Sequence, residues 1–120
     1  SDEEWIVLEE FIGMCQGESS GCSLDFGQRG SNQEGHQLKA QGTAFWNNGN
    51  GTDEWGFRAL GGGRRQADGN YSSLREEGEY WTSTNITGHP VQRKFTTYST
   101  GVYRDNTGPD KGFSVRCVKD

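Results

Sequence analysis

Apolar residues at the start of the chain recur with the spacing of an α-helix that has one apolar face. These positions are Trp5, Leu8, Phe11 and Ile12. Side chains three or four residues apart share one side of a helix, so this face is expected to pack on a core. Ser1 and Glu4 fit a capping box, in which each side chain accepts from the other residue's backbone N–H. With Gly13 as a stop signal, the pattern predicts a helix that begins at the first residue.

The next stretch has few apolar positions and predicts loops around one short helix. Residues 13–36 are rich in Gly, Ser, Gln and Glu, which indicates a long loop. Residues 35–42 can form about two turns of helix, and the apolar residues 44–46 that follow need burial. Residues 47–52 have the Asn and Gly composition of a turn.

From Gly56 onward, short β-prone runs alternate with turns rich in Gly and Asn. The runs are residues 57–60, 80–83, 91–98, 101–104 and 113–118. This arrangement predicts a small antiparallel sheet with long connections. In the third run, alternation places one set of residues on the core side: Val91, Arg93, Phe95 and Thr97. The other face is expected to be solvated, and it carries Gln92, Lys94, Thr96 and Tyr98.

Length and composition limit the class of protein. At 120 residues the chain is interpreted as a single domain that spans residues 1–120. Four Trp, four Tyr and six Phe can build a core despite the shortage of aliphatic residues. A net charge of −5 argues against a nucleic-acid partner, and no apolar run is long enough for a membrane span.

The cysteines point to an oxidising compartment. Cys15 and Cys22 are close enough in sequence to close a small ring, although two free cytosolic thiols remain an alternative. Cys117 stands alone near the end of the chain. The first residues are acidic and helical, so any export signal is expected upstream or already removed.

Motifs for catalysis and metal binding are weak. Residues 17–21 fit the G-x-S-x-G pattern, but a nucleophile elbow needs a strand before it, and here a helix is predicted. His36 and His89 have no nucleophile at a catalytic spacing, and the Cys and His residues lack metal-ligand spacing. The sequence therefore predicts a protein that is not an enzyme and has no cofactor or metal site.

Several motifs match one known family in order and spacing. They are Ser1–Trp5, Gly35–Lys39, Trp55–Leu60, Gly62–Arg65, Asp68–Gly69, Tyr80–Thr84 and the ending Gly112–Asp120. In these segments the chain resembles the Fibrobacter succinogenes major paralogous domain, and the terminal run Gly-Phe-Ser-Val-Arg-Cys-Val is the most specific match. The resemblance covers nearly the whole chain, apart from residues 14–34. It implies an α+β fold of the C-type-lectin-like superfamily, with two helices on a small twisted antiparallel sheet and long loops.

The resemblance also implies a missing partner segment. Relatives usually carry a segment before the Ser-Asp-x-Glu-Trp helix, with a cysteine followed by Gly, Trp and a Leu-Pro step. This segment holds the first strand of the fold, which is expected to be lacking here. The resemblance implies that its cysteine is the natural disulfide partner of Cys117. Within residues 1–120 Cys117 is therefore expected to be unpaired, and the expected partner is the upstream segment of its own chain.

Some positions depart from the family's pattern. Relatives often have aromatic residues along the strand that corresponds to residues 91–98, whereas this chain has mostly polar ones. Trp55 stands where relatives have a small polar residue. Residues 46–48, Trp-Asn-Asn, are faintly similar to the Trp-Asn-Asp triplet of calcium-dependent lectins, but the surrounding loop pattern differs, so calcium-dependent sugar binding is disfavoured.

The predicted binding residues are exposed side chains on the loop-bearing face. They are Trp55, Asn85, Thr87, His89, Gln92, Lys94, Thr96 and Tyr98. Together with the resemblance, they predict a non-catalytic ligand-binding or adhesion module at the surface of a bacterium, with a carbohydrate or protein ligand. Two alternatives remain: a structural spacer in a surface lipoprotein, and a degenerate relative of formylglycine-generating enzymes.

Overall fold

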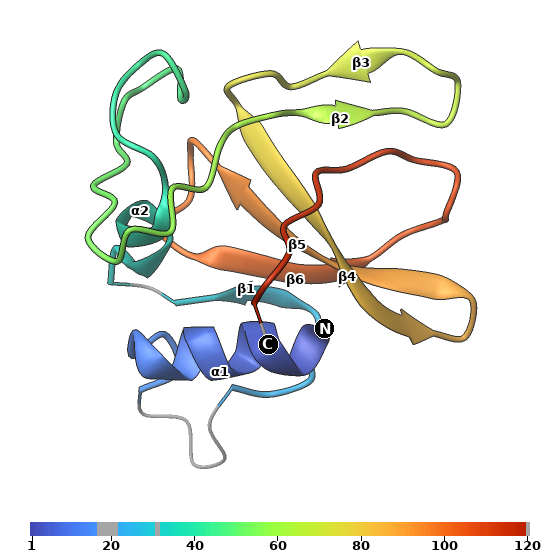
Figure 1. Cartoon of the computed structure of the whole chain (residues 1–120), viewed down its shortest axis with the longest axis horizontal. Coiled ribbons are helices and arrows are strands. Elements are labelled where there is room, and N and C mark those ends of the chain that lie inside the picture. Colours follow the sequence, from blue (N-terminus) through green and yellow to red (C-terminus); the bar gives the residue numbers. More distant parts are fainter. Residues whose placement is uncertain (17–21, 31, 120) are drawn as a thin grey trace.

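The computed structural model describes residues 1–16, 22–30 and 32–119 and shows an α+β fold, as predicted (Figure 1). The helices are α1 (Asp2–Phe11) and α2 (Glu34–Leu38). The strands are β1 (Gly27–Arg29), β2 (Arg64–Arg65), β3 (Tyr71–Ser72), β4 (Glu77–Ile86), β5 (His89–Thr96) and β6 (Val102–Asn106). An antiparallel sheet has the order β1-β6-β5-β4, and β2 and β3 form a separate hairpin. No helix in these described ranges is long and apolar enough to cross a membrane.

Helix α1 begins as the sequence predicts. The Glu4 amide donates to the Ser1 hydroxyl over 3.3 Å, and the Glu4 carboxylate accepts from the amino group of Ser1 at 2.5 Å. Gly13 follows the helix with a φ of +83°, in the left-handed region that favours glycine. The predicted apolar face is wrong at one position, because Phe11 is 73% exposed. The helix buries Asp2 and Glu9 beside Ile12 instead.

The acidic side chains on the sheet-facing side of α1 form ion pairs with arginines from the sheet. Asp2 accepts from Arg93 and Arg104 at 2.6 Å each, and Glu9 accepts from Arg93 at 2.6 Å and from Arg29 at 2.7 Å. All five side chains are buried. Buried charges are tolerated only when they are paired and hydrogen-bonded, so this ionic cluster fixes the orientation of α1 on β1, β5 and β6.

The strand predictions are confirmed for the central sheet and wrong elsewhere. Residues 80–83, 91–98 and 101–104 fall largely within β4, β5 and β6. Residues 57–60 and 113–118 form no strand. Ala59 makes an isolated bridge to Lys39, and Ser114 makes one to Tyr80 of β4. Strand β1 lies inside the stretch predicted as loop; it pairs with β6 from Gly27↔Arg104 to Arg29↔Val102. The short helix within residues 35–42 is confirmed as α2.

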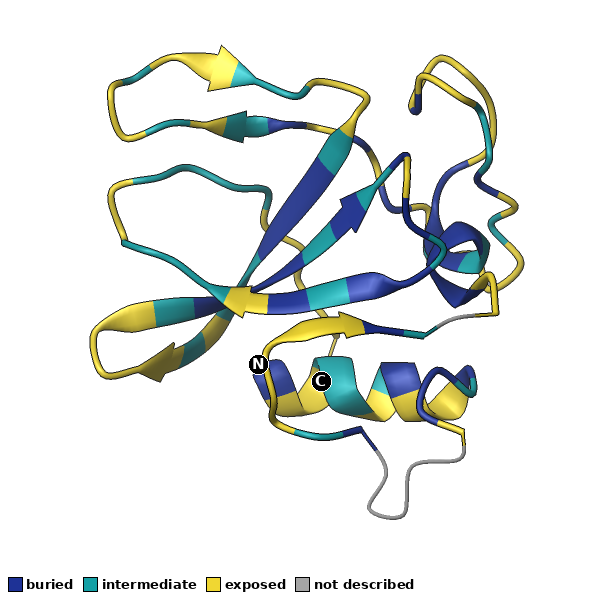
Figure 2. Cartoon of the chain, turned by 180° about the vertical axis from the view of Figure 1, so that it is seen from behind, coloured by how far each residue is buried: buried dark blue, intermediate teal, exposed yellow. Residues whose placement is uncertain are grey.

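The two faces of β5 differ much as alternation predicts. Val91, Arg93, Phe95 and Thr97 are all buried, and Figure 2 shows buried stretches in dark blue along the long strands of the sheet. The opposite face was expected to be solvated, and this is wrong for Gln92, which is only 5% exposed. Trp81 lies opposite Gln92 in the register and stacks on Phe113 at 4.3 Å, so aromatic rings cover this part of the face.

The core is aromatic and centred on Trp46. This side chain is fully buried, and its indole N–H donates to the Ala59 carbonyl over 3.0 Å. Of the apolar residues 44–46, only Trp46 enters the core, because Phe45 lies at the surface. The remaining buried core residues come from α2, the sheet, the segment around the cysteines and the connection between α2 and β2: Ile12, Met14, Cys15, Cys22, Leu38, Ala59, Tyr80, Phe95 and Val102.

The predicted bond between Cys15 and Cys22 is present, and their Cα atoms are 5.1 Å apart. Cys117 is a free, exposed thiol. The G-x-S-x-G run of residues 17–21 lies outside the described residues.

Candidate functional site

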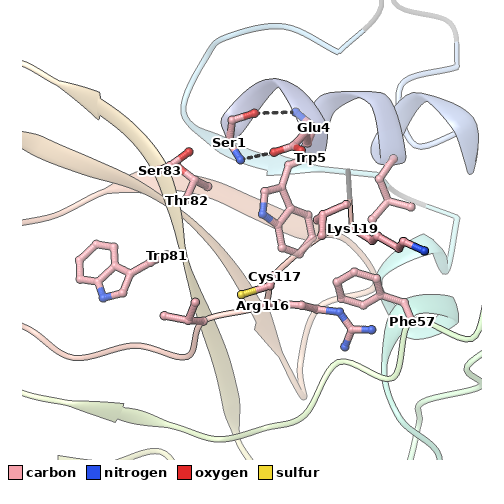
Figure 3. Close-up of a pocket in the computed structure, with 13 residues that line it drawn as sticks. Ser1, Glu4, Trp5, Phe57, Trp81, Thr82, Ser83, Arg116, Cys117 and Lys119 are labelled. Carbon is pink, nitrogen blue, oxygen red and sulfur yellow. Dashed lines mark hydrogen bonds and ion pairs between the residues drawn. The ribbon is translucent and has the colours of Figure 1, made fainter.

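A groove of about 870 Å³ opens between the first half of α1, the strand β4 and the C-terminal segment of residues 115–119 (Figure 3). It is lined by Ser1, Glu4, Trp5, Leu8, Phe57, Trp81, Thr82, Ser83, Val115, Arg116, Cys117, Val118 and Lys119. Most of this surface is carbon, with hydroxyl groups and charged side chains at the margin. We call it the α1 groove.

The wall formed by α1 is rigid because Trp5 is held by the core. Its ring lies 5.4 Å from Phe57, 6.2 Å from Tyr80 and 6.1 Å from Phe95, and the guanidinium of Arg93 lies 5.9 Å from its centre. Aromatic pairs at these separations are attractive and orient the rings. Trp5 is therefore fixed on one side while its other side lines the groove.

The opposite wall is the C-terminal segment, which leaves the sheet after Ser114. Up to that point it runs beside β4: the Ser114 amide donates to the Glu79 carbonyl over 2.9 Å, and the Trp81 amide donates to the Ser114 carbonyl over 3.0 Å. Beyond it, residues 115–119 make no backbone hydrogen bond to the described parts of the sheet. Val115 is 74% exposed, and Arg116 is held only by its guanidinium, 4.2 Å from the centre of the Phe57 ring.

The edge of β4 that faces the groove therefore loses its backbone partner beyond Trp81. The Trp81 N–H is bonded to Ser114, and the carbonyl of the same residue points to the same edge, beyond the last backbone bond to the C-terminal segment. Residues 115–118 belong to no helix or strand, and their backbone groups make no hydrogen bond to the described parts of the sheet. Exposed strand edges of this kind are templates for pairing with another strand.

Trp55 does not line the groove but lies near the other end of α1. Its ring packs edge-on against Phe11 with 5.4 Å between centres, and its indole N–H donates to the Gln37 side chain over 3.2 Å. At 46% exposure it forms an aromatic surface pair with Phe11.

Asn85, Thr87 and His89 lie together at the exposed turn between β4 and β5 (Figure 1). The Asn85 side chain accepts from the Gly88 amide at 2.7 Å, and Thr87 has a positive φ of 51°. These side chains shape their own turn, and the hairpin that carries them projects away from α2.

The last four predicted residues are spread along β5 and beyond its end. Gln92 is buried, Lys94 lies with its ammonium 5.1 Å from the Tyr103 ring, and Thr96 is half-buried. Tyr98 follows the strand and is 86% exposed. The structure thus distributes the eight predicted residues over three regions and does not bring Trp55 together with the β5 residues.

The sequence analysis missed the groove. Trp5 and Leu8 were assigned to the core, Phe57 to a strand and Trp81 to a family motif. A signal existed in the C-terminal run, where Phe113, Val115 and Val118 are apolar and Val115 and Val118 remain exposed in the structure. Apolar side chains at an unpaired end indicate a contact made by another segment.

His36 lies inside the domain and is hydrogen-bonded there. Burial, and secondly the charge of Lys39, lower the pKa of His36, whose Nδ1 lies 3.2 Å from the Lys39 amine. In the residue ranges described above, no cluster of three or more His, Cys, Asp or Glu side chains could hold a metal ion. In the lectin-like triplet, Trp46 is buried, and Asn48 donates to the Thr97 carbonyl.

Comparison with known proteins identifies one match. The family model described as the Fibrobacter succinogenes major domain matches residues 1–119. No curated protein and no solved structure matches the chain.

Proposed function

Because the chain belongs to the Fibrobacter succinogenes major domain family, we propose that it is an exported, non-catalytic recognition or adhesion domain of a bacterial surface protein. The observation that carries this proposal is the α1 groove, in which apolar side chains lie open beside an unpaired strand edge. Contiguous exposed apolar surface on a soluble domain marks a site of interaction. The Cys15–Cys22 bond supports export, because such bonds persist in oxidising compartments.

The chemistry of the groove favours a polypeptide over a carbohydrate. Its floor is made by Trp5, Leu8 and Phe57, which offer shape and apolar contact but few directed hydrogen bonds. The hydrogen-bonding groups at its side belong to the backbone of β4 and of residues 115–118. An extended peptide can satisfy such groups by strand addition, while alternate side chains fill the apolar floor.

The occupant that we propose first is the segment upstream of Ser1, which the family resemblance implies. Ser1 lines the groove, so a segment that joins it there can turn into the cleft. The Cys117 thiol also lines the groove and is exposed, within reach of a cysteine on such a segment. By strand addition the domain would bind its own preceding strand. When that strand is displaced, the groove would bind a strand of a partner protein instead.

A peptide-binding experiment tests this function. The probe is a synthetic peptide with the sequence encoded upstream of Ser1, titrated against the chain while tryptophan fluorescence is followed, because Trp5 and Trp81 line the groove. Binding should be lost in Leu8→Arg, which places a charge on the groove floor. The matched control is Val7→Arg, a neighbouring and exposed position of α1 outside the groove, which should bind normally.

The same experiment with glutathione buffer tests the role of Cys117. Thiol–disulfide exchange should transfer the bond from oxidised glutathione to the Cys117–peptide pair, releasing two reduced glutathione molecules; mass spectrometry detects the adduct. Cys117→Ser should abolish the adduct but retain weaker binding. If the peptide binds neither reversibly nor covalently, the groove is not its site, and the alternative of a structural spacer domain gains support.

The third possibility, a degenerate relative of formylglycine-generating enzymes, has less support from the geometry. That chemistry uses a pair of reactive cysteines in a cleft. Cys15 and Cys22 are buried and joined to each other, and neither lines the α1 groove.

A further inference from the structure

The turn that follows β5 is fixed through its carbonyl groups, far from the α1 groove. Residues 97–101 connect β5 to β6 and carry Tyr98. The Thr97 carbonyl accepts from the side-chain amides of Asn48 at 2.5 Å and Asn50 at 3.0 Å. The Thr100 carbonyl accepts from the Gly35 amide at 2.7 Å.

The two remaining carbonyls that anchor the turn are bound by one buried lysine. The Lys39 ammonium donates to the Thr96 carbonyl and, over 3.3 Å, to the Ser99 carbonyl. Its third neighbour is Nδ1 of His36, at 3.2 Å. An ammonium has three N–H donors, so these three acceptors match its capacity.

Lys39 is fully buried, and no carboxylate is bonded to its charge among the described residues. Two aromatic groups lie beside the charge: the imidazole of His36, whose pKa the charge helps to lower, and the ring of Trp46, whose centre lies 5.0 Å from the ammonium. Burial lowers the pKa of Lys39 to about 8, so the side chain is still mostly charged at neutral pH. Burying a lysine costs free energy, and an aliphatic side chain would fill this place without that cost.

The group that this arrangement presents is Tyr98. Its side chain is 86% exposed, between Thr97 and Ser99, which are both buried. A large ring on a fixed backbone can make a contact with little loss of conformational entropy.

We propose that Lys39 is an internal cation that locks the turn of residues 97–101 and thereby fixes the backbone from which Tyr98 projects outward. The ammonium takes the place that a bound cation would have, because it is hydrogen-bonded to carbonyl oxygens on both sides of the turn. The aliphatic part of the lysine side chain connects these carbonyls to the end of α2. This conformational role goes beyond the proposed function and does not depend on the α1 groove.

The lock predicts a local effect of removing the charge. In Lys39→Gln, which keeps two N–H donors but no charge, amide hydrogen exchange in residues 97–101 should accelerate at least tenfold, while α1 exchanges at the wild-type rate. The matched control is Lys94→Gln, which removes a half-exposed lysine from β5 and should leave the turn protected. Equal loss of protection in α1 and the turn, or no change in the turn, would overturn the proposal.

Chemical rescue separates the cation from the volume of the side chain. In Lys39→Ala, added n-propylammonium should restore protection of the turn, whereas tetramethylammonium, which has charge but no N–H donors, should not. If the alanine variant does not fold, the wild-type chain provides a second measurement by NMR. The Lys39 ammonium protons should be visible at neutral pH because they are bonded and buried, and rapid exchange of these protons with water would contradict the lock.

Discussion

The two sides of α1 reverse the usual distribution of side chains. On the side that faces the sheet, Asp2 and Glu9 are buried together with arginines. On the groove side, Trp5 and Leu8 line an open cleft, and Phe11 lies at the surface. The difference teaches that burial of a charge depends on the available partners, and that the apolar side chains to examine for binding are those that lie together in one groove and not those exposed singly.

The largest effect is expected from breaking the ionic cluster. In Glu9→Gln the charges of Arg29 and Arg93 lose their common partner inside the protein. Removing one member of a buried ion pair costs about 3 to 5 kcal/mol, since it leaves an uncompensated buried charge. Urea unfolding measures the loss. Glu3→Gln, an exposed position on the same helix, is the control and should change the free energy of unfolding by less than about 0.5 kcal/mol.

A smaller effect is expected from acid. Burial by itself raises the pKa of Asp2, but hydrogen bonds and charge from Arg104 and Arg93 outweigh it and hold the pKa below the ordinary value. A carboxyl group with a lowered pKa in the folded state stabilises the fold above its ordinary pKa, near 4, and this contribution is lost as the pH falls. The urea concentration at the unfolding midpoint of the wild type should therefore fall when the pH is lowered below about 4. At pH 6 the Asp2→Asn variant should have a lower free energy of unfolding than the wild type, and its stability should fall less steeply as the pH is lowered. If stability falls with pH equally steeply in both proteins, the role of Asp2 is contradicted.

The smallest effect on stability is expected in the groove. Val118→Ser should change the free energy of unfolding of the chain by less than about 0.5 kcal/mol, because Val118 is largely exposed. The same substitution should weaken binding of the upstream peptide, since Val118 lines the groove. Urea unfolding and peptide titration on one sample compare the two. A large loss of stability would mean that residues 115–119 pack more tightly on the domain than their exposure indicates.

Local patterns predicted much of the secondary structure. The capping box of Ser1 and Glu4 places the start of α1, and the alternation through Val91 and Phe95 identifies the buried face of β5. The cysteine spacing predicted the disulfide. These features depend on residues close in sequence. Strand β1 was missed because its three residues carry no β-prone pattern and are stabilised by pairing with β6.

The candidate sites were harder to predict. The eight residues chosen for binding were selected for exposure, but Gln92 is buried; its cross-strand neighbour Trp81 packs on Phe113, which comes from the C-terminal part of the chain. The α1 groove combines the first turns of α1 with the C-terminal segment, a contact between the two ends of the chain that no local pattern encodes. The assignment to the C-type-lectin-like superfamily, the role at the bacterial surface and the absence of catalysis stay predictions.

By itself the sequence determined the family, through motifs that extend from Ser1 to Lys119, together with the helix start, the central strands and the disulfide. Only the tertiary structure decided which charges are buried, where apolar side chains remain open, and which carbonyls Lys39 binds. The physical reason is that helix caps, alternation and short disulfide rings are set by neighbours in sequence. Ion pairs, grooves and buried cations depend on residues brought together from about 20 to 100 positions apart.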